Sequence, residues 1–389
     1  MSWKTRAWAA AGAAGVAAAG TAVGVARHRH VIAARGAGEV ARLGSLHSDP
    51  ITVHATDGVA LHVEIDPLPE GAGRRPRHRG RARGNQPRIE DLTVIFVHGF
   101  TLNLDSWHFQ RAGYRGQVRT VYYDQRSHGR SGRSSRENST IEHCAEDLVR
   151  VMDEVAPDGP VVLVGHSMGG MTIVALAEAH PELFGERVVG VGLVATTAGG
   201  LSPLHMIVPV IPEGFGADLA QRVIAGLARG SRVIEHMRRL SSSVALVVTD
   251  MFAFGDEVPA AYVEFVDAMI SATPFEVLSE FFPNFEALDK FSALSALERV
   301  PTAIIGGTED KLTSIGHSRK LAKAIAGSVL TECTGAGHMV LIERHEQVNA
   351  ALDQLIAGAL DPASWPATTA EAAVADEPGG IAGSAVEAP

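Results

Sequence analysis

The chain has 389 residues, 46% hydrophobic and 20% charged, and only two cysteines, Cys144 and Cys333, neither in a metal-ligand spacing. This composition can bury a substantial core, which excludes a wholly disordered chain and a small disulfide-stapled domain. The net charge of −10 combines +6 over residues 1–90 with −16 over the remainder, and an acidic body argues against nucleic acid as a partner.

A run of twenty residues near the N-terminus carries no charge. Residues 7–26 consist of Ala, Gly and Val apart from Trp8 and Thr21, and basic residues flank both ends. Twenty residues are enough to cross the hydrocarbon layer as a helix, although the absence of Leu, Ile and Phe weakens the drive for insertion. We therefore expect residues 1–45 to be a membrane anchor. An export signal, cleaved or retained, and an Ala-rich cytoplasmic helix remain alternatives.

Two further segments have the composition of solvated chain. Residues 71–88 contain seven Arg among Gly and Pro, so we expect a basic loop inserted into the surface of the body. An alternative role for this loop is attraction to anionic lipid headgroups, together with the anchor. The acidic tail, residues 361–389, lacks an apolar period and is expected to be disordered.

Short apolar runs alternate with helical patterns over residues 46–200 and 301–360. Asp57-Gly58 predicts a hairpin turn between the first two runs, and the later runs are typical of strands covered on both faces. This order predicts an α/β fold with a mostly parallel central sheet and helices on both faces, and a ligand site beyond the C-terminal strand ends. The predicted strands are Ile51–His54, Val59–Ile65, Leu92–Val97, Arg119–Tyr123, Val161–Val164, Val188–Val194, Thr302–Ile305 and Ser328–Glu332, and predicted helices include Ile141–Val155 and Met168–Ala179.

The strand Val161–Val164 leads into Gly165-His166-Ser167-Met168-Gly169-Gly170 and then into a helix. This is the G-x-S-x-G pattern of a nucleophile elbow, in the strand–turn–helix context that the elbow requires. A sharp turn lifts the Ser167 hydroxyl clear of the sheet. Because the backbone approaches itself closely there, Gly165 and Gly169 must lack side chains.

A serine hydroxyl needs a base, and the base needs a third group to hold it. The last predicted strand leads into Gly335-Ala336-Gly337-His338, a flexible loop that can bring His338 over the sheet edge. Asp310 follows the strand Thr302–Ile305, and the order Ser167, Asp310, His338 is the order that follows such an elbow. Glu309 is the rival acid, since an error of one position in the loop would exchange the two.

An oxyanion hole requires two N–H donors. We expect one from Met168, directly after the nucleophile, at a helix N-terminus whose dipole favours negative charge. The other is expected from the loop that follows Leu92–Val97, with Phe100 as the first choice and Thr101 as the second. Removing one such donor typically costs about 2.7–4 kcal/mol of transition-state stabilisation.

About 100 residues separate Val188–Val194 from the next core strand, far more than the one helix that connects parallel strands. We therefore expect residues 201–300 to form an inserted helical cap, with breaks at Pro274 and Pro283. Its apolar residues predict a lipophilic pocket and an ester of a medium or long acyl chain, although such residues also serve to pack a cap on its core. The predicted cap helices are Ala217–Leu227, Val233–Leu240, Val258–Ile270 and Phe275–Phe282, and the apolar residues are Met206–Pro212, Met251–Phe254, Phe265, Met269, Phe275, Phe281, Phe282 and Phe285.

Taken together, these motifs resemble the α/β-hydrolase fold superfamily over roughly residues 50–358. The match rests on the His98-Gly99 turn, the segment Asp124–Ser131, the elbow, the acid turn and the histidine loop. The resemblance implies that Asp124–Ser131 fixes a loop near the elbow, with Ser127 where the family usually has Gly. It also implies that His98 and His128 hold loops rather than react, and that the cap roofs the active site.

We therefore predict a serine hydrolase that cleaves carboxylic esters of lipophilic acyl groups, without a metal or an organic cofactor. The serine at the elbow disfavours the dehalogenase and epoxide hydrolase chemistry of the family, which relies on a carboxylate. Carbon–carbon bond hydrolysis and perhydrolase activity remain alternatives, and a ligand-binding protein that keeps the pocket is the non-enzyme alternative. We expect membrane association through residues 7–26, with attraction of the basic loop to lipid as an alternative role for that loop, and with exported and cytoplasmic proteins as alternatives.

Overall fold

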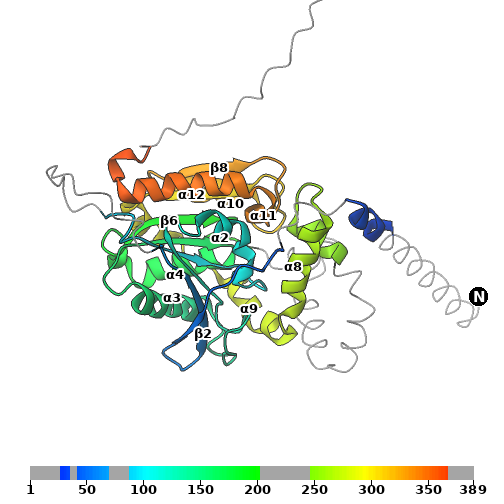
Figure 1. Ribbon diagram of the computed structural model, residues 1–389, viewed down its shortest axis with the longest axis horizontal. Helices are drawn as coiled ribbons and strands as arrows, with labels where there is room; N and C mark the ends of the chain where they lie inside the picture. Colours follow the sequence, from blue (N-terminus) through cyan, green and yellow to red (C-terminus); the bar gives the residue numbers. More distant parts are fainter. Residues whose placement is uncertain (1–26, 36–41, 70–86, 202–245, 367–389) are drawn as a thin grey trace, which may run out of the picture.

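The computed structural model describes residues 27–35, 42–69, 87–201 and 246–366. Over these residues eight strands form one sheet in the order β1-β2-β4-β3-β5-β6-β7-β8, with helices against both faces (Figure 1). The pairs β1–β2 and β2–β4 are antiparallel and all other pairs are parallel, so the sheet is mostly parallel, as predicted. The strands are β1 (Pro50–His54), β2 (Ala60–Asp66), β3 (Thr93–Val97), β4 (Arg119–Tyr123), β5 (Val161–His166), β6 (Val188–Val194), β7 (Thr302–Gly307) and β8 (Val329–Cys333).

Helices follow most of the strands. The α-helices are α2 (His108–Tyr114), α3 (Ile141–Val155), α4 (Met168–Ala179), α8 (Ala260–Ala272), α9 (Phe275–Ala287), α10 (Ile315–Ala324), α11 (Val340–Glu343) and α12 (His345–Leu360). Short 3₁₀ segments are η1 (Leu104–Trp107), η2 (Pro181–Leu183), η3 (Phe291–Arg299) and η4 (Pro362–Ser364). Two further helices occupy residues 27–34 and 246–253.

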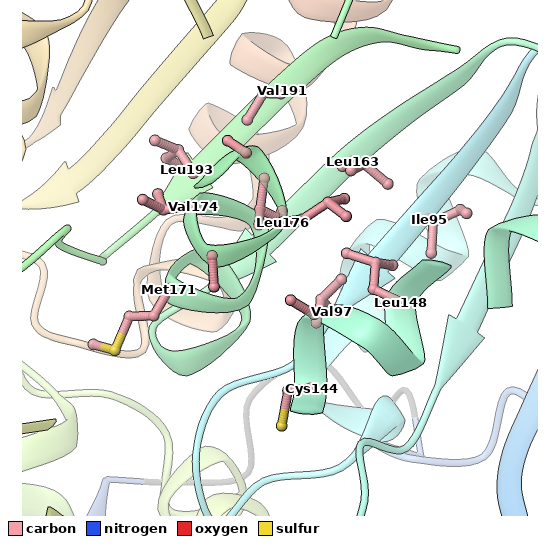
Figure 2. Close-up of a cluster of buried hydrophobic side chains, with 14 of the residues drawn as sticks. Ile95, Val97, Cys144, Leu148, Leu163, Met171, Val174, Leu176, Val191 and Leu193 are labelled. Carbon is pink, nitrogen blue, oxygen red and sulfur yellow. The ribbon is translucent and has the colours of Figure 1, made fainter. Parts of the chain in front are cut away.

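The core lies on both faces of the sheet, because alternate residues of a strand point to opposite sides. In β3, Ile95 and Val97 belong to a buried cluster that includes side chains of α3 and α4. Val94 and Phe96 belong to the second cluster, on the side of α2 and α12. Figure 2 shows the first cluster, in which Leu148 of α3 lies beside the β3 side chains. Burial on both faces explains why these strands read as continuous apolar runs.

Several predicted bounds are confirmed. β4, β6, α3 and α4 begin and end at the predicted residues. β5 and β7 each run two residues further than predicted, because His166 still pairs with Val194 and Gly307 still pairs with Cys333. The parallel ladder therefore continues up to the elbow on one strand and to the acid turn on the other.

The predicted break at Pro283 is wrong, since α9 continues through it to Ala287. A proline inside a helix removes one hydrogen bond and costs about 3 kcal/mol. The flanking residues Phe281 and Phe285 are 0% and 1% exposed on the same face of α9, so their burial holds the helix together. The proline ring itself is exposed.

The predicted disorder of the tail begins too early, because residues 361–366 are ordered. The indole N–H of Trp365 donates to the Gly327 carbonyl at 2.8 Å, and its ring packs so closely on α12 that a Cβ at Gly358 would lie 2.6 Å from it. One aromatic side chain therefore holds a segment whose remaining composition favours disorder.

Other predictions lie outside the described residues. They concern residues 7–26, most of the basic loop, the predicted helices Ala217–Leu227 and Val233–Leu240, and the apolar run Met206–Pro212. In the described part of the chain, no helix combines the length and the hydropathy that crossing a bilayer requires.

Candidate active site

Ser167 stands in the turn between β5 and α4, where the parallel strands end. Its backbone has φ +51° and ψ −116°, a sparsely populated conformation that costs a non-glycine residue about 1–3 kcal/mol. A Cβ at Gly165 would lie 2.4 Å from the Gly169 carbonyl oxygen, and a Cβ at Gly169 would lie 2.1 Å from the Val97 carbonyl oxygen. Both positions therefore require glycine, and the surrounding backbone holds the strained turn.

Hydrogen bonds to neighbouring elements fix this turn. The Ser167 N–H donates to the Val194 carbonyl of β6 at 3.0 Å, and the Thr196 hydroxyl donates to the Ser167 carbonyl at 2.6 Å. Ser167 is only 7% exposed. Its hydroxyl is thus presented in a protected place at the end of the sheet.

The structure brings Asp310 and His338 together. The His338 Nδ1 atom lies 2.9 Å from Asp310 Oδ2. An ionised carboxylate can only accept, so Nδ1 carries a proton, and in the neutral ring Nε2 is then the nitrogen that can accept one. Glu309 is exposed, whereas Asp310 is 5% exposed and 28 residues before the histidine it holds. The geometry therefore distinguishes the two acids that the sequence left open.

Asp310 is kept ionised by the groups around it. Burial raises its pKa, whereas the neighbouring His338 and two backbone N–H groups lower it. These N–H groups belong to Leu312 and Thr313 and donate to Oδ1 at 2.8 and 2.9 Å. The net effect is a pKa below the usual value of an aspartate. The Thr313 hydroxyl lies 2.9 Å from Asp310 Oδ2 and 2.7 Å from the Ala195 carbonyl oxygen. Sequence reasoning missed Thr313, although an Asp in a loop is a usable sign of a turn in which its side chain accepts the backbone N–H two residues on, here that of Leu312.

A second histidine ties the base to the elbow. His166 directly precedes Ser167, and its Nε2–H donates to the His338 carbonyl at 2.9 Å. The two imidazole rings lie 4.9 Å apart between centroids. Burial lowers the pKa of His166 to about 3, so its ring is neutral at pH 7 and does not compete for the proton of Ser167.

Among the described residues, no hydrogen bond joins the Ser167 hydroxyl to His338. Catalytic hydrogen bonds are often long in ligand-free structures and tighten when the substrate binds. The structure therefore joins two of the three predicted residues directly, and brings the third to the same strand ends through His166.

The predicted oxyanion donors follow the neighbouring parallel strands β5 and β3. Met168 is the first residue of α4, where a backbone N–H has no partner within the helix and the helix dipole is positive. Phe100 follows β3, and its carbonyl accepts the Thr101 hydroxyl at 2.6 Å. Thr101 has φ +60°, and its own carbonyl accepts the Thr273 hydroxyl of the segment after α8 at 3.0 Å. The loop is thus held in one conformation.

His98 holds this loop through hydrogen bonds at both of its ring nitrogens. Its Nε2 accepts the Gln125 backbone N–H at 2.9 Å, so Nδ1 carries the proton and donates to the Gly99 carbonyl at 2.7 Å. The Gln125 side chain donates back to the His98 carbonyl at 2.7 Å and accepts from Thr172 of α4 at 3.0 Å. Burial lowers the pKa of His98 to about 3. A neutral imidazole with a hydrogen bond at each ring nitrogen supports the loop.

The segment Asp124–Ser131 forms a turn next to this loop, and its residues 124–128 are buried. The Asp124 carboxylate accepts the backbone N–H groups of Leu104 and Arg130, both at 2.7 Å. Ser127 has φ +66°, the left-handed region that explains why glycine is usual there. Its hydroxyl accepts the Ser134 N–H at 2.9 Å, a bond that glycine could not make.

The histidine loop is fastened to the helices inserted between β6 and β7. The Glu343 carboxylate accepts N–H groups from Gly255 and Asp256 of the inserted segment and from Gly337 of the loop, at 2.8–3.3 Å. A Cβ at Gly337 would lie 2.5 Å from the Gly255 nitrogen. The two segments are therefore in backbone contact beside His338.

A cluster of aromatic rings connects the inserted segment to the loop of Phe100. The Phe100 ring lies 5.0 Å from that of Phe285 and 6.1 Å from that of Phe281, both on α9. His128 lies against Phe100 and Phe281, and burial lowers its pKa to about 4. Met251, one of the apolar residues predicted for the pocket, is 47% exposed.

No cluster of three or more His, Cys, Asp or Glu side chains suited to a metal ion occurs in the parts of the chain that the structure describes. What the site offers is a hydroxyl, an oriented imidazole and backbone N–H groups.

An elbow serine on a mostly parallel eight-stranded sheet, followed along the chain by an Asp and a His that meet above it, defines an α/β hydrolase. A model described as the alpha/beta hydrolase family matches residues 94–351. This chain belongs to that family.

Curated relatives are distant. The chain is 26% identical over 281 residues to the "putative carbamate hydrolase RutD" of a Caulobacter species, covering 70% of this chain and 93% of that protein. It is 25% identical over 256 residues to the acetyltransferase component of the acetoin cleaving system of Pseudomonas putida, covering 66% of this chain and 61% of that protein. The second match thus spans less than two thirds of its relative.

Solved structures agree on the fold. An enol-lactonase from Burkholderia xenovorans superposes with a TM-score of 0.59 at 25% identity, covering 79% of this chain and 100% of that chain. An esterase from Thermogutta terrifontis superposes with a TM-score of 0.58 at 21% identity, covering 80% and 99%. Together with the family match, these similarities support a hydrolase.

Proposed function

We propose that this protein is a serine hydrolase that cleaves carboxylic esters through an acyl-enzyme intermediate. The observation that carries the proposal is the 2.9 Å contact between Asp310 and His338 Nδ1. It orients an imidazole with a basic Nε2 at the same strand ends as the elbow hydroxyl of Ser167.

The first half-reaction forms the acyl-enzyme. His338 Nε2 takes the proton of the Ser167 hydroxyl as the oxygen attacks the ester carbonyl. The N–H groups of Met168 and Phe100 stabilise the oxyanion, each worth about 2.7–4 kcal/mol in the transition state. The resulting imidazolium, stabilised by Asp310, then protonates the leaving alcohol as the carbon–oxygen bond breaks.

The second half-reaction releases the acid. Water gives a proton to His338 Nε2 and attacks the acyl carbonyl, and the imidazolium returns that proton to Ser167 as the acyl–oxygen bond breaks. The products are one carboxylic acid and one alcohol, and the enzyme is regenerated. The esterase and lactonase among the similar structures bear names for reactions at such a carbonyl.

We further propose that the inserted helices form a cap over this site and that the acyl group is lipophilic. Contacts between Phe100 of the oxyanion loop and the buried Phe281 and Phe285 of α9 support this placement. An apolar wall beside an oxyanion donor suits an alkyl chain, because burying each methylene is worth about 0.8 kcal/mol.

The experiment that tests the reaction is labelling with a fluorophosphonate, which reacts with activated serines. The full chain should be labelled and Ser167→Ala should not, whereas Ser139→Ala serves as a matched control with an unrelated buried serine. Absence of labelling in the folded full chain would refute the mechanism. A series of p-nitrophenyl esters tests the acyl group: kcat/KM should rise from acetate to octanoate, and activity confined to acetate would contradict a lipophilic pocket.

A further inference from the structure

The helix formed by residues 27–34 is fastened to the inserted helix 246–253 by one of its faces. His28 Nε2 lies 2.8 Å from Asp250 Oδ2, and the Arg35 guanidinium donates to both oxygens of the same carboxylate at 2.6 and 3.1 Å. Between them Ile32, 1% exposed, belongs to the same buried cluster as Val247. Positions 28, 32 and 35 share one helix face, so this face packs against helix 246–253.

The exposed surface of these two helices carries large hydrophobic side chains as well as basic ones. Only five large hydrophobic side chains are exposed in the described ranges, and three of them lie on this helix pair: Val31 (40%), Val248 (48%) and Met251 (47%). Val248 and Met251 are three residues apart and share a helix face. The other two, Ile51 and Ile89, lie on different parts of the chain. We name the set Val31, Val248 and Met251 the outer face.

The outer face is adjacent to the candidate active site. The Met251 carbonyl accepts the Lys311 ammonium at 2.7 Å, and Lys311 directly follows Asp310. At the end of the same helix, the Ala253 carbonyl accepts the Met339 N–H at 2.8 Å, immediately after the catalytic histidine proposed above. Figure 1 places the helix of residues 27–34 at one end of the molecule, beyond α8.

The basic residues of helix 27–34 and the uncharged run before it both indicate which surface covers the outer face. Residues 27–35 contain three Arg and no acidic residue, with Arg27 and Arg29 exposed, although the whole chain carries a net charge of −10. Exposed cations beside apolar side chains suit an anionic lipid surface. The twenty residues that precede Arg27 are uncharged and have the length expected of a membrane anchor. They would bring the outer face to a bilayer.

We propose that the outer face docks on the surface of an anionic phospholipid bilayer. Val31, Val248 and Met251 enter the boundary between headgroups and acyl chains, while Arg27 and Lys311 face the headgroup phosphates. The turns that carry Asp310 and His338 then lie directly behind the docked helix. If the hydrolase function proposed above holds, a lipophilic ester reaches the site from the bilayer.

An environment-sensitive fluorophore placed on the outer face tests this docking. Cys144 and Cys333 are both buried, so a nitrobenzoxadiazole label can be directed to Met251→Cys in the full chain. The matched control is Ile51→Cys, which is 38% exposed on β1. With phosphatidylcholine vesicles containing phosphatidylglycerol, the label at position 251 should brighten and shift to the blue, and spin-labelled lipid should quench it. The label at position 51 should do neither.

Each result bears on the proposal. Equal responses at the two positions, or an equal response to pure phosphatidylcholine vesicles, would overturn it. A concentration-dependent shift at position 251 without vesicles would assign the face to a second copy of this chain and would also overturn it.

A loss-of-contact variant gives a second measurement. Val248→Ser should lower the vesicle partition coefficient about tenfold, because burying such a side chain contributes about that factor. Hydrolysis of p-nitrophenyl butyrate in vesicle-free buffer should stay unchanged in this variant. That assay tests the proposed function separately, so failure of docking and failure of catalysis are distinguishable.

Discussion

Replacing Asp310 by Asn tests the proposed mechanism at its most sensitive point. The carboxylate accepts from the backbone N–H groups of Leu312 and Thr313 on one oxygen and from His338 Nδ1 on the other. An asparagine can keep the first two bonds through its carbonyl oxygen, which leaves its NH₂ group opposite Nδ1. That group can only donate, so His338 must place its proton on Nε2.

The wrong tautomer removes the base while leaving the fold intact. General-base catalysis contributes about 10²–10⁴-fold, and a triad with its acid changed to the amide loses about 10⁴-fold. We therefore expect kcat for a p-nitrophenyl ester to fall by about 10³–10⁴-fold in Asp310→Asn, equivalent to about 4–5 kcal/mol. KM should change little, because Asp310 is buried behind the imidazole.

The assay compares Asp310→Asn with Glu309→Gln, which removes the neighbouring exposed carboxylate. Glu309→Gln should keep kcat within about twofold, in line with the small effect of exposed charges. The thermal midpoint of each variant checks that it is folded. A folded Asp310→Asn variant that retains wild-type kcat would refute the role of Asp310, and loss of activity in Glu309→Gln alone would transfer the role to Glu309.

Three further predictions concern stability. Gly169→Ala places a Cβ 2.1 Å from the Val97 carbonyl oxygen and should lower the free energy of unfolding by about 3 kcal/mol or more. The control Gly316→Ala lies in a helix where the nearest atom is 3.5 Å away and should stabilise by up to about 1 kcal/mol; equal effects in urea denaturation would contradict the packing argument. Pro283→Ala should raise the free energy of unfolding by about 1–3 kcal/mol, because the residue is exposed and alanine restores a helix hydrogen bond; a destabilised variant would show that the ring makes a needed contact. Burial lowers the pKa of three histidines in the folded state. Below pH 6.5 these histidines take up protons in the unfolded chain but not in the folded one, so the free energy of unfolding should fall as the pH drops from 6.5 toward 4. Asp124 opposes this trend in part, because burial raises its pKa to about 6 and the folded state then binds the extra proton. A free energy of unfolding that stays constant from pH 7 to pH 4.5 would contradict the neutral state of these rings: His98, His128 and His166.

Much of the sheet was predictable because its signal is local. Strands buried on both faces are mostly apolar along their length, and the run that became β6 consists of Val, Leu and Gly throughout. The elbow was predictable for a different reason. Glycine at positions 165 and 169 is a steric requirement of the turn around Ser167, so the spacing itself encodes the geometry.

Features that depend on distant contacts were not predictable. Pro283 is read locally as a helix end, but the burial of Phe281 and Phe285 against the body outweighs the missing hydrogen bond. The choice between Asp310 and Glu309 required knowing which side chain is buried near a residue 28 positions later. The ion pair between Arg35 and Asp250 joins residues 215 positions apart, and no local sequence pattern predicts it.

The carboxylate of Glu343 has a mechanical consequence. It gathers backbone N–H groups from Gly255, Asp256 and Gly337 onto one side chain, so this corner of the inserted segment cannot swing away without tearing the histidine loop from its position. If the proposed cap opens to admit substrate, Gly255 and Asp256 stay attached to the histidine loop, and the contact that would have to part is that between Phe100 and Phe285 of α9. The hydrogen bonds of Glu343 beside His338 thus restrict the directions in which a cap could move.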